Sequence, residues 1–117
     1  MLKRVLPMLL LACAAALAHD ISGKWTFNVE TDAGSGSPTF VFKQDGEKLT
    51  GTYSGTFGTA DLKGTVKGDA IEFAIEVNVG DQKGTVVYKG TIESAAKMKG
   101  DVELAGLGKG TWTGARQ

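Results

Sequence analysis

The sequence predicts an all-β protein, a small antiparallel up-and-down barrel of about eight strands. After the first 18 residues, large apolar residues alternate with polar or small ones at a period of two, and no helical period competes with this pattern. Gly, Asp and Ser interrupt the alternating runs at short intervals, as turns between sequential strands do. Eight such strands can close on themselves, and closure removes exposed sheet edges.

The first residues are typical of an export signal. Lys3 and Arg4 precede an apolar run that is too short to span a bilayer and that ends at Ala18 in a small-residue cleavage signature. We therefore expect residues 1–18 to be a signal peptide and residues 19–117 to form one β-barrel domain. The location this predicts is periplasmic or secreted.

Cys13, the single cysteine of the chain, keeps an alternative open. The segment ending at Cys13 resembles a lipobox, in which this cysteine would carry a lipid anchor instead of being removed by cleavage after Ala18. In both cases the folded domain contains no cysteine, so it has neither a disulfide nor a thiolate for catalysis or metal binding. Its stability must come from packing.

Each expected strand has large apolar residues at every second position, which places them on one face. In chain order, the strands with their inward residues are 22–30 (Trp25, Phe27, Val29), 38–44 (Phe40, Phe42), 47–54 (Leu49, Tyr53), 61–67 (Leu62, Val66), 71–79 (the five odd positions), 85–92 (Val86, Tyr88, Ile92), 98–104 and 111–116. The pairs Asp45-Gly46, Gly68-Asp69 and Gly80-Asp81 supply short turns. Residues 31–37 are expected to form a flexible loop, part of which, 33–37, would cover one barrel end.

A glycine recurs in the middle of the strands, flanked two positions away on each side by an apolar residue. Gly51, Gly64, Gly90 and Gly100 follow this pattern, and alternation directs them inward. Mid-strand Gly costs about 0.5–1 kcal/mol of stability relative to Ala, so its repeated use requires a structural advantage that offsets this cost. We expect these glycines to allow sharp strand coiling and to leave room for a neighbouring ring, the alternative being a ligand cavity. Because bulky aromatic residues are available to fill the interior, any cavity should be small.

The segment Gly23-Lys24-Trp25, together with Arg116 near the end of the last strand, resembles the signature of the calycin superfamily, which includes lipocalins and avidins. The resemblance implies that Arg116 stacks on Trp25 and closes one barrel end. The segment 49–53 also resembles an avidin motif, which would make Tyr53 a hydrogen-bonding residue of the barrel mouth. Asn28, however, lies on the opposite strand face from the avidin Asn, and other polar groups of an avidin site are missing, so we do not expect a biotin site.

The residues predict neither an enzyme nor a metal or cofactor site. His19 is the only histidine and lies at the cleavage position, and alternation places Glu72 and Glu76 on the outer face. The chain has thirteen basic and thirteen acidic residues, and without Lys3 and Arg4 eleven basic residues remain against thirteen acidic ones, a net charge of −2. The basic residues are scattered, so no nucleic-acid partner is expected.

Two functions remain open. The first is a binding module that takes a small apolar or amphipathic ligand at one barrel mouth, near Trp25, Tyr53, Tyr88 and Trp112. The alternative is an accessory module without a ligand, which would contact another exported protein or a surface polymer through its outer faces. The oligomeric state is not predicted.

Overall fold

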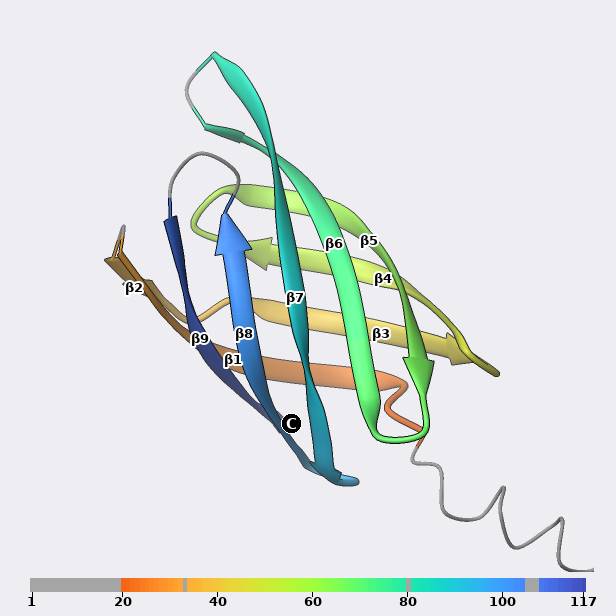
Figure 1. Ribbon diagram of the computed structural model, residues 1–117. Coiled ribbons are helices and arrows are strands. Elements are labelled where there is room, and N and C mark those ends of the chain that lie inside the picture. The colour runs from red at the N-terminus through yellow and green to blue at the C-terminus, as the bar shows by residue number, and fades with distance from the viewer. Residues whose placement is uncertain (1–19, 33, 80, 105–107) are drawn as a thin grey trace, which may run out of the picture.

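The computed structural model describes residues 20–32, 34–79, 81–104 and 108–117. These residues form nine strands in one antiparallel sheet without helices (Figure 1). In chain order the strands are β1 (Gly23–Thr31), β2 (Gly34–Gly36), β3 (Thr39–Asp45), β4 (Lys48–Gly55), β5 (Gly58–Lys67), β6 (Ala70–Val79), β7 (Gln82–Ser94), β8 (Lys97–Leu104) and β9 (Gly108–Arg116). The expected signal peptide, with Cys13 and the cleavage position, lies outside the described residues.

The sheet closes into a barrel of eight strands, as the sequence predicts. Sequential strands are neighbours from β3 to β9, and β1 pairs with both β3 and β9. The β1–β9 ladder runs from Trp25 opposite Arg116 to Thr31 opposite Gly110. Short turns between strands make sequence neighbours spatial neighbours, and the last ladder removes the two long edges.

The ninth strand, β2, corrects the prediction of a flexible loop at residues 31–37. Gly34–Gly36 turns back antiparallel on the end of β1, with Thr31 opposite Gly34, and the Thr31 hydroxyl donates a hydrogen bond to the Gly34 carbonyl at 2.8 Å. Pro38 interrupts the ladder before β3 begins, because it has no N–H to donate. Its carbonyl still accepts a hydrogen bond from the Phe27 N–H at 2.9 Å. Because β2 consists of Gly and Ser only, apolar alternation does not predict this strand.

One predicted turn is displaced by a residue. Asp45 belongs to β3 and pairs with Lys48, so the two-residue connection is Gly46-Glu47 and not Asp45-Gly46. Gly46 has φ of 65°, a left-handed conformation that glycine adopts without a steric penalty.

Aromatic rings fill much of the barrel interior. The six bulky aromatic side chains of the predicted core are each at most 2% exposed: Trp25, Phe27, Phe40, Phe42, Phe73 and Trp112. Phe27 stacks on Trp112 with ring centroids 4.5 Å apart, and Phe73 stacks on Tyr88 at 4.8 Å. Offset and edge-to-face ring pairs add to the hydrophobic gain from burial, so this cluster is the main packing unit of a domain without cysteine.

The inward glycines are sites of close backbone approach. A Cβ on Gly90 would lie 2.1 Å from the Lys99 carbonyl oxygen and 2.6 Å from Cζ2 of Trp112, and one on Gly100 would lie 2.0 Å from the Lys89 carbonyl oxygen. Gly90, Gly100 and Trp112 are opposite one another on β7, β8 and β9. The glycines thus let adjacent strands coil closely and leave a niche for the indole, as the sequence predicts.

Candidate functional site

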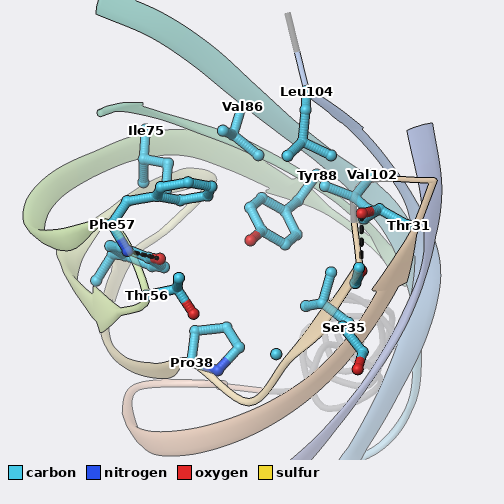
Figure 2. Close-up of a pocket in the computed structure, with 14 residues that line it drawn as sticks. Thr31, Ser35, Pro38, Thr56, Phe57, Ile75, Val86, Tyr88, Val102 and Leu104 are labelled. Atoms are coloured by element: carbon cyan, nitrogen blue, oxygen red, sulfur yellow. Dashed lines mark hydrogen bonds between the residues drawn. The ribbon is translucent and has the colours of Figure 1, made fainter. Parts of the chain in front are cut away.

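The barrel interior is incompletely filled at one end, where a cavity of about 110 Å³ lies partly open to solvent. One wall is aliphatic and consists of Ile75 from β6, Val86 from β7, and Val102 and Leu104 from β8 (Figure 2). The rim includes Pro38 and parts of β2. No charged side chain lines the cavity among the residues that the structure describes.

The turn between β4 and β5 covers part of this mouth. Gly55 and Gly58 pair across the turn, which leaves Thr56 and Phe57 at its tip. The Phe57 N–H donates a hydrogen bond to the Tyr53 hydroxyl at 3.3 Å, drawn as a dashed line in Figure 2. The turn packs so closely that a Cβ on Gly55 would lie 2.7 Å from the same hydroxyl. This contact places the half-buried Phe57 ring beside the cavity, facing Ile75 (Figure 2).

Tyr88 supplies the polar group in the middle of the cavity. Its ring is held by the stack on Phe73, its side chain points into the hollow (Figure 2), and the residue is only 4% exposed. Its hydroxyl makes no hydrogen bond within the described part of the chain, whereas the Tyr53 hydroxyl has the Phe57 N–H as donor. Burial raises the pKa of Tyr88 far above its ordinary value, and the neighbouring Tyr53 raises it further. The group is therefore a neutral phenol at all physiological pH values.

Trp25 and Arg116 lie at the opposite end of β1 from this cavity. The Arg116 Cζ atom lies 4.9 Å from the centroid of the Trp25 ring, which is the stacking that the calycin resemblance implies. The guanidinium also donates hydrogen bonds to three carbonyl oxygens, those of Ser22 at 2.6 Å, Asp20 at 2.8 Å and Ala95 at 2.8 Å. This arrangement ties β1, β9 and the β7–β8 turn together and covers that end of the barrel.

Gly23 has a specific role in this closure. Its φ is 130°, and a Cβ there would lie 2.9 Å from Nη1 of Arg116. Position 23, two residues before Trp25, therefore needs glycine both for its backbone conformation and for the space that the guanidinium occupies.

Like Trp25, Trp112 does not line the cavity. Its indole N–H donates a hydrogen bond to the Asp101 carbonyl at 2.8 Å, and its ring stacks on Phe27. The structure thus brings Tyr53 and Tyr88 together in the lining of one cavity, whereas Trp25 and Trp112 do not line it. Alternation identifies which side chains point inward, whereas it carries no information on their depth along the barrel.

Sequence reasoning missed the residues that shape the mouth, above all Phe57, Thr56 and the aliphatic wall. A signal for Phe57 is present, since a bulky apolar residue between two glycines in a turn is unusual unless it packs against something. Asn28, considered through the avidin resemblance, is exposed on the outer face, where its Oδ1 accepts a hydrogen bond from Ser37 at 3.2 Å.

The rest of the described surface offers less defined sites. Grooves of about 480 and 530 Å³ lie over β7, β8 and β9, but exposed Lys, Asp, Glu and Thr side chains make up most of their lining and both are open to solvent. Within the described ranges, no three His, Cys, Asp or Glu side chains are placed to hold a metal ion. None of the described segments forms a helix that is long and apolar enough to cross a bilayer.

Comparison with known proteins gives similarity in structure only. No family model matches the chain, and no curated protein matches it. Among solved structures, it is similar to a redesigned beta barrel, b11L5F_LGL, with a TM-score of 0.69 and 23% identity over 89% of this chain and 95% of that one. It is also similar to the redesigned barrel mFAP1 bound to DFHBI (TM-score 0.62, 17% identity, 89% and 98% covered) and to EF1p2_mFAP2b bound to DFHBI (0.59, 19%, 89% and 97%). At these identities the likeness shows a shared fold, the small closed antiparallel β-barrel.

Proposed function

We propose that this protein is a binding module that takes a small apolar or amphipathic ligand into the cavity at the β2 end of the barrel. The observation that carries the proposal is a void of about 110 Å³ with an aliphatic wall in an interior that is otherwise filled by aromatic rings. Protein interiors pack like organic crystals and hold few voids larger than a water molecule, so an unfilled space of this size needs a reason.

The size and chemistry of the void favour a ligand over ordered water. A dry apolar cavity of about 150 Å³ is known to bind benzene. This cavity is smaller, at about 110 Å³, but it is open at its mouth, so it can take one end of a small ring compound or a short branched chain. Removing apolar ligand surface from water contributes about 25 cal/mol per Å². The void walls also gain the dispersion contacts that they lack when empty.

Two further observations support the proposal. The mouth is shaped by Phe57 on the β4–β5 turn, whose two-residue tip can yield more readily than a ladder strand. Two of the similar barrels were solved with DFHBI bound, so the architecture has held a small molecule in those proteins. By contrast, the described outer surface exposes a single large apolar side chain, Val41 at 45%, and this gives little support to the accessory-module alternative.

Toluene tests the proposal because it matches the cavity in polarity and approximate size. Titration followed by backbone amide chemical shifts should show saturable changes at Val86, Tyr88 and Val102, with Kd of about 1 mM or tighter for so small a ligand. The substitution Val86→Phe places a ring in the cavity and should abolish the saturable shifts. The matched control Val87→Phe, on the outer face of the same strand, should leave them unchanged. Shift changes that rise without saturation, or that survive Val86→Phe, would contradict the proposal.

We also propose that the module is exported through residues 1–18, on the strength of the basic start and apolar run described above. The mass of the protein recovered from periplasmic and membrane fractions tests this. A chain starting at residue 19 supports cleavage after Ala18, and a diacylated chain starting at Cys13 supports the lipid anchor. Recovery of the intact chain from the cytoplasm alone would refute export.

A further inference from the structure

We infer that the ligand is an uncharged molecule whose inserted end carries a hydrogen-bond acceptor, such as a carbonyl oxygen, and that the Tyr88 hydroxyl donates to it. The inference rests on the proposed function and deepens it, because it names the chemical class that the cavity selects.

The unpaired hydroxyl of Tyr88 is the main observation. A hydroxyl buried without a partner costs free energy, and nearly all buried polar groups in native proteins are hydrogen-bonded. Tyr88 is 4% exposed, and the stack on Phe73 holds its ring so that the hydroxyl faces the cavity (Figure 2). A phenylalanine in this position would keep the packing, so the hydroxyl is best explained by a hydrogen-bond partner inside the cavity, and a bound ligand supplies one.

The second tyrosine specifies an acceptor rather than a donor. The Tyr53 hydroxyl already accepts the Phe57 N–H, which leaves its own O–H available to donate. Tyr88 likewise presents an O–H. Both tyrosines line the same cavity, so a ligand that enters it meets two phenolic O–H donors.

The lining excludes a charged ligand. The remaining polar groups at the mouth are uncharged, with Thr56 and Ser35 among them, and no Lys, Arg, Asp or Glu of the described chain lines the cavity. An ion taken from water into such an apolar space loses far more hydration energy than two phenolic hydrogen bonds return. The cavity should therefore discriminate against a carboxylate of the same shape as a neutral ligand.

Three monosubstituted benzenes of similar size separate these effects: isopropylbenzene, acetophenone and benzoate. The measurement is the dissociation constant of each for wild type and for Tyr88→Phe, by calorimetry or amide shifts at neutral pH. We expect the substitution to weaken acetophenone binding about fivefold, since a net hydrogen bond contributes about 1 kcal/mol. Isopropylbenzene should bind both proteins equally, and benzoate should bind wild type at least about tenfold more weakly than acetophenone.

The outcomes distinguish the inference from the proposed function. If isopropylbenzene binds saturably but Tyr88→Phe affects all ligands alike, the inference is overturned and the apolar binding site stands. The same holds if benzoate binds as well as acetophenone. If none of the three binds, the proposed function itself fails. Thermal unfolding of Tyr88→Phe serves as the folding control, and we expect the variant to be at least as stable as wild type because it removes an unpaired buried hydroxyl.

Discussion

Substituting Gly90 by Ala is the sharpest test of why glycines recur in these strands. Gly90 of β7 lies opposite Gly100 of β8, and Trp112 of β9 is the next residue across the sheet. The added Cβ would lie 2.1 Å from the Lys99 carbonyl oxygen, which is 0.9 Å short of the 3.0 Å that real Cβ contacts respect. It would also lie 2.6 Å from Cζ2 of the Trp112 indole.

The expected cost follows from two opposing contributions. Replacing Gly by Ala lowers the entropy of the unfolded chain and stabilises by about 0.4–1 kcal/mol where the native backbone tolerates it. Forcing an extra carbon into a packed interior costs about 1–3 kcal/mol, and more where the obstruction is backbone. We expect a net destabilisation of about 2–3 kcal/mol for Gly90→Ala, which corresponds to a fall in Tm of roughly 10–20 °C for a domain of this size.

Urea unfolding followed by tryptophan fluorescence measures this change, because Trp25 and Trp112 are both buried in the folded state. Gly36→Ala is the matched control, since its Cβ would lie 3.4 Å from the Thr56 hydroxyl oxygen and neither glycine has positive φ. That control should stay within about 0.5 kcal/mol of wild type. A Gly90→Ala protein as stable as the control would refute the close-approach argument.

The double substitution Gly90→Ala with Trp112→Phe separates the two obstructions. Removing the larger indole relieves the ring contact but leaves the Lys99 carbonyl in place. We therefore expect the losses in the free energy of unfolding to add: the double variant should be less stable than Trp112→Phe by the full cost of Gly90→Ala. Full recovery would show that the ring, and not the backbone, requires glycine.

Three other predictions concern the two ends of the barrel. Arg116→Ala removes three hydrogen bonds and the contact with Trp25, and it should lower the free energy of unfolding by about 1–3 kcal/mol. Arg116→Lys should recover less than half of this loss, because lysine lacks the planar guanidinium that donates several hydrogen bonds at once. Phe57→Ala should raise the dissociation rate of toluene several-fold in lineshape analysis, with a smaller change in stability since the side chain is only half-buried. Because the pKa of Tyr88 is raised in the folded state above its ordinary value of 10.0, the unfolded chain loses this proton first, and stability should fall as pH rises above about 10. In urea titrations over that pH range, the free energy of unfolding should fall more steeply with pH for wild type than for Tyr88→Phe. Equal slopes for the two proteins would contradict this prediction.

Alternation and turn residues are local properties, and they were sufficient for most of the barrel. A period of two defines the inward face of a strand without reference to its neighbours, so Phe27, Phe73 and Ile75 are predicted and found in the core. Short turns restrict the order of the strands to a meander, and eight twisted strands without covering helices favour closure. The strand β2 was missed because Gly and Ser carry no apolar alternation, and only its pairing with Val29–Thr31 makes it a strand.

For the candidate site, the sequence predicts the direction of each side chain but not its height in the barrel, for a physical reason. The inward direction of Trp25, Tyr53, Tyr88 and Trp112 is encoded in each strand, but their heights in the barrel depend on how neighbouring strands are staggered. That stagger is set by the registers of all eight ladders together, and it separates Trp25 from the two tyrosines. The state of the Tyr88 hydroxyl likewise depends on what lies around it in three dimensions. The sequence by itself determined a closed barrel with a filled, aromatic interior, whereas the tertiary structure alone decided where the filling ends and which polar group faces the space that remains.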